Sequence, residues 1–62
     1  GGIFCDFCIN FVEDAIKHAK GLTKEKLAEM IPSTYRDKVD LIYKLIEQKA
    51  TPENICQAIN LC

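Results

Sequence analysis

Two pairs of cysteines lie at opposite ends of the chain, Cys5 and Cys8 near its start and Cys56 and Cys62 at its end. An even number of cysteines in 62 residues suggests disulfides and an oxidising compartment. If the two ends are bonded to each other, almost the whole chain becomes one closed loop. Because burial alone gives a chain this short only marginal stability, this closure is the strongest constraint on the fold.

Four cysteines can pair in three ways. Local bonds within each pair would restrain almost nothing, whereas bonds between the ends close loops worth up to about 4 kcal/mol each in the chain-entropy model, though not additively. If the ends run antiparallel, the outermost residues meet, so we expect Cys5–Cys62 and Cys8–Cys56. The alternative is a zinc site, but the second pair has five intervening residues, more than the two to four typical of zinc ligands.

Composition narrows the class of protein. At 48% hydrophobic and 27% charged residues, the chain is neither disordered nor membrane-spanning. Its 8 basic and 9 acidic side chains are spread along the sequence and give a net charge of -1, which argues against nucleic acid as a partner. We expect one domain over residues 1–62.

The apolar residues recur with helical spacing and predict four amphipathic helices, over residues 3–19, 23–31, from 33 or 34 to 49, and from 51 onward. Gly21 is expected to stop the first helix and Pro32 the second. Thr23 and Thr51 are expected N-caps, the latter followed by proline at the first helical position. No strand-like alternation is present, so the predicted fold is all-α.

An enzyme is not expected. A cysteine nucleophile acting with His18 would need a free thiol, which the expected disulfides deny. The sequence also contains no paired-carboxylate motif and no glycine-rich phosphate loop. We therefore expect neither catalytic residues nor a metal or cofactor.

Several motifs resemble the saposin-like family. They are the Cys-x-x-Cys that opens the first amphipathic helix, the Leu-Ile-Glu-Gln stretch, and the tail Thr-Pro-Glu-Asn-Ile-Cys-Gln-Ala-Ile-Asn-Leu-Cys. The opening Gly-Gly-Ile-Phe-Cys-Asp-Phe-Cys is similar to that of the amoebapores, which are pore-forming members. The chain departs from the family in being shorter and in having four cysteines where members usually have six. The positions of the middle pair hold Ala28 and Val39.

The resemblance implies a small saposin-like bundle of four helices, with the first and fourth in one half and the second and third in the other. Hinges are then expected near Gly21 and Leu22 and over residues 49–51. It also implies a peptide that binds lipid and permeabilises membranes as a pore-forming or antimicrobial agent. Because protonation of His18 would remove the net negative charge, acidic pH is expected to favour this activity. The alternatives are a non-lytic lipid carrier or activator, and an interaction module without lipid activity. Expected partners are phospholipid membranes, individual lipids or further copies of the chain. The expected location is outside the cell or inside an acidic, lysosome-like granule.

Candidate lipid-contacting residues follow from the apolar faces. Most are expected first of all in the core, with lipid contact as a second role on opening. Lys38 and Lys49 fall within the apolar arc of the third helix and could reach lipid phosphates. His18 is expected to titrate between neutral and acidic pH and so to sense pH. The full set of apolar candidates is Phe4, Phe7, Phe11, Ile16, Leu27, Met30, Ile31, Tyr35, Val39, Ile42 and Ile46.

Overall fold

The computed structural model describes residues 2–62. Its elements, in chain order, are α1 (Ile3–Lys17), α2 (Lys24–Met30), the 3-10 helix η1 (Ser33–Lys38), α3 (Val39–Glu47) and α4 (Pro52–Ala58). No strand occurs within this described range. The all-α bundle of four helices predicted from the apolar spacing is therefore confirmed.

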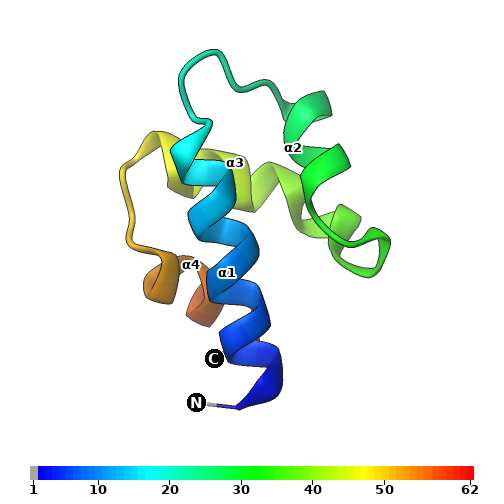
Figure 1. The fold of residues 1–62 in the computed structure, drawn as a ribbon, viewed down its shortest axis with the longest axis vertical. Helices are drawn as coiled ribbons and strands as arrows, with labels where there is room; N and C mark the ends of the chain where they lie inside the picture. The colour runs from blue at the N-terminus through cyan, green and yellow to red at the C-terminus, as the bar shows by residue number, and fades with distance from the viewer. Residues whose placement is uncertain (1) are drawn as a thin grey trace.

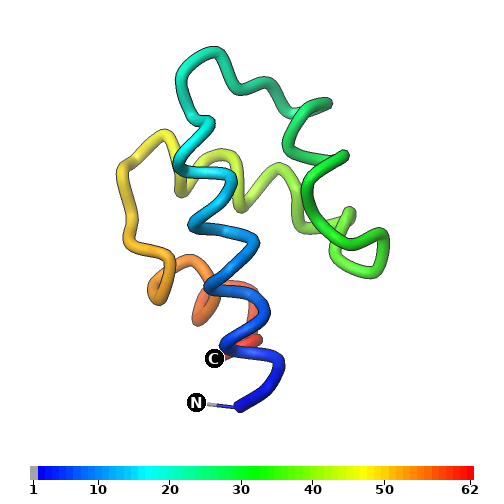
Figure 2. The backbone as a smooth tube through the Cα atoms, viewed as in Figure 1, coloured from blue at the N-terminus to red at the C-terminus, as the bar shows by residue number. Residues whose placement is uncertain are grey.

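The helices form two halves (Figure 1). α4 lies against the first part of α1, while α2 packs mainly on α3, which is continuous with η1. The smooth trace in Figure 2 shows that the chain leaves α1 at one end of the molecule, makes the α2–η1–α3 half, and returns to the first turns of α1. The result measures 31 × 23 × 16 Å, and both ends of the chain lie at the same end of the long axis.

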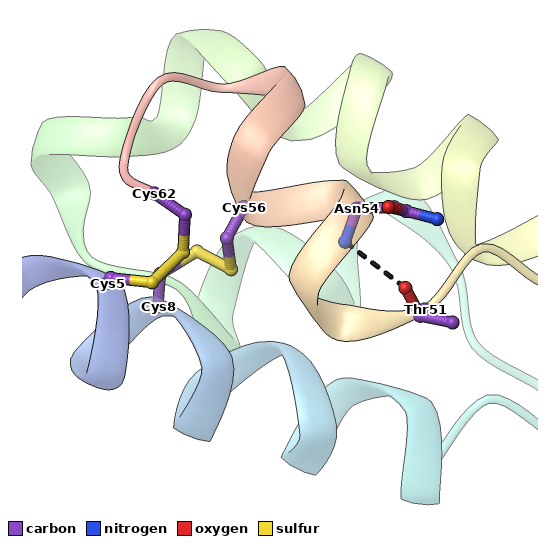
Figure 3. Close-up of a disulfide and its surroundings, with 6 residues drawn as sticks. All are labelled: Cys5, Cys8, Thr51, Asn54, Cys56 and Cys62. Carbon is purple, nitrogen blue, oxygen red and sulfur yellow. Dashed lines mark hydrogen bonds between the residues drawn. A yellow bond between two sulfur atoms is a disulfide. The ribbon is translucent and has the colours of Figure 1, made fainter. Parts of the chain in front are cut away.

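Two disulfides join α1 to the C-terminal segment (Figure 3). The pairs are Cys5–Cys62, with Cα atoms 4.6 Å apart, and Cys8–Cys56, with Cα atoms 6.0 Å apart. The expected connectivity is confirmed. Because all four sulfurs are bonded in this way, neither a zinc site nor a thiol nucleophile can be built from them.

The core is one cluster drawn from all four α-helices and the segments that flank them. The inner disulfide lies within it, since Cys8 and Cys56 are both fully buried. The other buried residues are Val12, Ala15, Leu22, Leu27, Ile31, Ile42, Ile46, Ile55 and Ile59. The two halves are therefore closed on each other, and the bond that braces one half also fills the shared interior.

The helix starts follow the sequence signals. The Thr23 hydroxyl accepts a hydrogen bond from the backbone N–H of Lys26 at 3.1 Å, and Thr51 accepts one from that of Asn54 at 3.2 Å (Figure 3). Each satisfies a donor that the first turn of a helix leaves unpaired. Pro52 occupies the first position of α4, where its missing N–H costs nothing.

The helix ends differ from the sequence expectation. α1 stops at Lys17 with His18 as its C-cap, two residues before the predicted end. Gly21 does not terminate the helix directly. It has a φ of 77° and is the third residue of a separate turn, closed by the N–H of Leu22 bonding the carbonyl of Ala19 at 3.0 Å. A positive φ at this position of a turn favours glycine.

The third predicted helix is two elements rather than one. Residues Ser33–Lys38 form the 3-10 helix η1, and the α-helical part begins only at Val39. Ser33, Thr34 and Asp37 are weak helix formers, which explains why the tighter 3-10 turn prevails there. The prediction of one α-helix from 33 or 34 to 49 was therefore wrong at both ends, since the α-helix runs from Val39 to Glu47.

α3 ends in a Schellman motif with Lys49 at the left-handed position. The N–H of Lys49 bonds the carbonyl of Ile46, and the N–H of Ala50 bonds that of Leu45, both at 3.0 Å. Lys49 has a φ of 62°, a conformation in which glycine is usual and a side chain with a Cβ is strained. The same arrangement closes α4, but there Asn60, a residue more tolerant of this conformation, takes the position with a φ of 67°.

Replacing Lys49 with glycine should therefore stabilise the protein. We expect Lys49→Gly to raise the free energy of unfolding by about 1 kcal/mol, since the strain of the left-handed conformation is removed. Lys44→Gly is the matched control, because Lys44 lies inside α3 and glycine there should cost about 1 kcal/mol. Urea unfolding followed by circular dichroism measures both. Equal losses in the two variants would contradict the strain argument.

Candidate functional site

Large apolar side chains are exposed at the first turns of α1. Ile3 is 85% exposed, Phe4 67% and Phe7 49%. We call these three residues the N-terminal apolar patch. They lie on the side of α1 next to the face that carries the buried Cys8, Val12 and Ala15. Exposed apolar side chains gathered in this way mark an interaction surface.

Aromatic contacts continue this patch toward the other half. The rings of Phe7 and Phe11 meet edge to face with centroids 5.5 Å apart. Phe11 in turn stacks on Tyr35 of η1, with centroids 6.2 Å apart and planes inclined by 21°. Such pairs stabilise beyond the area that they bury. The Phe11–Tyr35 stack therefore joins the two halves at the point where the exposed patch ends.

The structure divides the predicted lipid-contacting residues into three groups. Phe4 and Phe7 are exposed, which corrects the expectation that they belong first of all to the core. The reason is that no other helix covers the first turns of α1 on that side, since α4 packs on the disulfide side. The half-buried residues are Phe11, Ile16, Met30, Tyr35 and Val39. The buried residues are Leu27, Ile31, Ile42 and Ile46, which can meet lipid only if the halves open.

The two lysines predicted to contact lipid phosphates lie in different segments, separated by α3. Lys38 is half-buried at the end of η1. Lys49 lies beyond the end of α3 and is exposed in the segment that connects α3 to α4. The prediction that Lys49 lies within the apolar arc of a helix was wrong, because it required α3 to continue to residue 49, whereas α3 ends at Glu47. His18 is exposed at the C-terminal end of α1, where the dipole of the helix favours a positive charge.

A polar contact holds the turn between α1 and α2 against α3. The Tyr43 hydroxyl of α3 donates a hydrogen bond to the carbonyl oxygen of Leu22 at 3.2 Å, directly after Gly21. An exposed ion pair between Lys24 and Asp40, 3.4 Å long, joins the start of α2 to α3. Exposed pairs of this kind contribute little, so Tyr43 is the principal polar tie between α3 and the α1–α2 turn.

Several hollows lie on the surface of the described residues. One of about 390 Å³ is bordered by the outer disulfide, Asp6 and Glu53, and one of about 310 Å³ by Ile9, Glu13 and Glu53. A third, of about 520 Å³, lies at the α1–α2 turn. Within residues 2–62 no group of three potential metal ligands comes together. None of the helices described there has the length and apolar character to cross a bilayer.

Sequence reasoning missed Ile3 and Tyr43 as functional candidates. Ile3 lies one helical turn before Phe7, so the spacing of four residues already places both on one side of α1. Tyr43 was treated only as part of the apolar stripe of its helix. No local pattern reveals that its hydroxyl reaches Leu22, 21 residues earlier in the chain.

A comparison with protein families finds one match. The family model described as saposin-like type B, region 2 matches residues 38–62, which span α3, α4 and both C-terminal cysteines. The match supports the resemblance to the saposin-like family over this part of the chain. Comparisons with curated proteins and with solved structures find no significant match.

Removing the Tyr43 hydroxyl should loosen the closed form. We expect Tyr43→Phe to lower the free energy of unfolding by about 1 kcal/mol, because the carbonyl of the buried Leu22 loses its hydrogen bond. Tyr35→Phe is the control, since the Tyr35 hydroxyl has no hydrogen-bond partner within residues 2–62 and its ring stacking is kept. Thermal unfolding measures both, and equal stability of the two variants would exclude a role for the Tyr43 contact.

Proposed function

We propose that this chain is a saposin-like, membrane-interacting peptide that binds lipid and permeabilises target membranes. The observation that supports this function best is the exposed N-terminal apolar patch of Ile3, Phe4 and Phe7. An apolar surface at the end of a disulfide-braced helix can enter the boundary between headgroups and acyl chains without unfolding the protein. The family match to residues 38–62 points to the same class of partner.

Opening of the two halves is the step by which binding would become permeabilisation. Both disulfides lie within the α1–α4 half, so the α2–α3 half is held only by packing, by the Phe11–Tyr35 stack and by the Tyr43 hydrogen bond. Rotation about the turn at Gly21 and the hinge at Lys49 would expose Leu27 and Ile42, which are fully buried in the closed form. That surface would then be covered by lipid or by a second copy of the chain.

The disulfides and the expected response to acid indicate the compartment in which the protein would act. Two disulfides suit an oxidising environment, either outside the cell or inside an acidic, lysosome-like granule. Protonation of His18 would bring the formal net charge from -1 to zero and lower any repulsion from an anionic membrane. We expect lipid binding and leakage to be stronger at acidic pH for this reason.

The apolar patch gives the first test. Phe4→Ser/Phe7→Ser should reduce dye release from anionic liposomes at least about tenfold, since burying each ring in lipid is worth roughly 1.5–3 kcal/mol. Leu41→Ser is the control, because Leu41 is an exposed apolar residue of α3 and lies outside the patch. Leakage that falls equally in both variants would contradict a role for the patch. Lipid transfer without any leakage from the native protein would identify a carrier instead.

The acid response gives the second test. His18→Gln removes the one histidine of the chain while keeping a polar side chain at the exposed C-cap of α1. We expect the increase in liposome leakage between neutral and acidic pH to be largely lost in this variant, with leakage at neutral pH unchanged. A pH profile that matches that of the native protein would show that carboxyl groups, and not His18, set the response.

A further inference from the structure

The hollow at the α1–α2 turn has a lining unlike that of the other two. Its volume is about 520 Å³, and three of its side chains are basic: His18, Lys20 and Lys26. None of its lining residues is acidic, whereas the other two hollows each include Glu53 and a second acidic side chain. In a protein of net charge -1, this hollow is therefore a local concentration of positive charge. We call it the basic hollow.

The two lysines of the basic hollow form no ion pair within residues 2–62. The ion pair present in this part of the chain joins Lys24 and Asp40, and neither residue lines the hollow. The lysine side chains are exposed and hence available to an external anion. A lysine ammonium binds phosphate as a point charge with three donors.

The backbone around the basic hollow is held in place from several directions. Leu22 is buried and its carbonyl accepts the Tyr43 hydrogen bond. The Thr23 hydroxyl caps α2 through the N–H of Lys26. Gly21 sits in the turn closed by Ala19 and Leu22. The flexible side chains that would meet a ligand therefore project from a backbone that need not be ordered on binding, which lowers the cost of association.

The rest of the lining favours an amphiphile over a water-soluble phosphate ester. Leu22 and Met30 supply apolar surface beside the basic groups, and methionine adapts well to irregular apolar partners. No Phe, Tyr, Trp or Arg lines the hollow, so only the small ring of His18 could stack on a nucleobase. We infer that the basic hollow binds the phosphate group of an anionic phospholipid, with Lys20 and Lys26 as the principal contacts.

The position of the basic hollow fits the membrane contact proposed above, on which this inference rests. Phe4, Phe11 and His18 are spaced by seven residues and so lie near one line along α1. Fourteen residues of helix span about 21 Å. The apolar patch at the first turns of α1 and the basic hollow just beyond its last turn thus lie near the same line along the helix. A membrane on this side of α1 would meet the apolar patch and the basic hollow at the two ends of the line, with Tyr35 of η1, which stacks on Phe11, between them.

Two charge-matched variants test the inference on vesicles. Lys20→Gln/Lys26→Gln removes the basic hollow, and Lys17→Gln/Lys44→Gln removes two exposed lysines outside it; either change takes the net charge from -1 to -3 (-1 - 2 = -3). On vesicles of phosphatidylcholine with phosphatidylglycerol, we expect the first variant to bind about 25-fold more weakly than the native protein and the second within about twofold, because each lysine at the lipid surface contributes about a fivefold factor. Equal weakening would overturn the inference and leave membrane binding itself intact.

A second measurement separates the lipid headgroup from free phosphate and does not depend on vesicles. Amide NMR shifts are followed on adding inorganic phosphate or monomeric dihexanoyl-phosphatidylglycerol. Shifts at Lys20, Gly21 and Leu22 that disappear in Lys20→Gln/Lys26→Gln but persist in Lys17→Gln/Lys44→Gln support the site. If phosphate alone produces them, free phosphate is also a ligand; if only the lipid does, the headgroup is needed. No shift with either would overturn the inference, even if the native protein binds vesicles. Absence of all vesicle binding would instead refute the proposed function.

Discussion

The bond between the two ends of the chain is the constraint on which the rest of this small fold depends. A hydrophobic core in a domain of this size rarely supplies more than about 3–5 kcal/mol. A disulfide that closes a loop of 57 or 48 residues is worth roughly 4 kcal/mol in the chain-entropy model. The second bond adds less. Once the first has formed, the second closes only the small ring made of residues 5–8 and 56–62, which is worth roughly 3 kcal/mol or less. The covalent contribution is thus comparable to that of the entire core.

The same bonds distribute rigidity unequally between the halves. α1 and α4 are fixed to each other by both bridges, and the inner bridge is fully buried. The α2–α3 half is held by side-chain packing and by a few polar contacts. Among these, the half-buried Tyr43–Leu22 hydrogen bond joins α3 to the turn after α1. Each connection between the halves also includes a residue with positive φ, Gly21 in one and Lys49 in the other. The opening proposed above would therefore involve the α2–α3 half and the two short segments at Gly21 and Lys49.

Features that depend on local chemistry were predictable from the sequence. The caps at Thr23 and Thr51, the proline that opens α4 and the number of helices all follow from a few adjacent residues, and the disulfide pairing follows from the antiparallel ends. The end of α3 was not predictable, because Lys49 gives no sign that it will adopt the left-handed conformation usually left to glycine. Likewise, apolar periodicity identifies a face of α1 but not how far along that face a partner extends. Phe4 and Phe11 have the same spacing signal, yet only Phe11 meets a ring from another element.

The shared location of the chain ends has a further consequence. The outer bridge holds Cys62 with its Cα atom 4.6 Å from that of Cys5, and Cys5 follows directly on Ile3 and Phe4. Any polypeptide or label attached at either terminus would emerge at the same turns of α1 that carry these two exposed side chains, and one of sufficient size could shield them from solvent and from lipid. A fusion at one end and a fusion at the other would thus mask the same surface, whereas a probe on the exposed face of α3 would leave it bare.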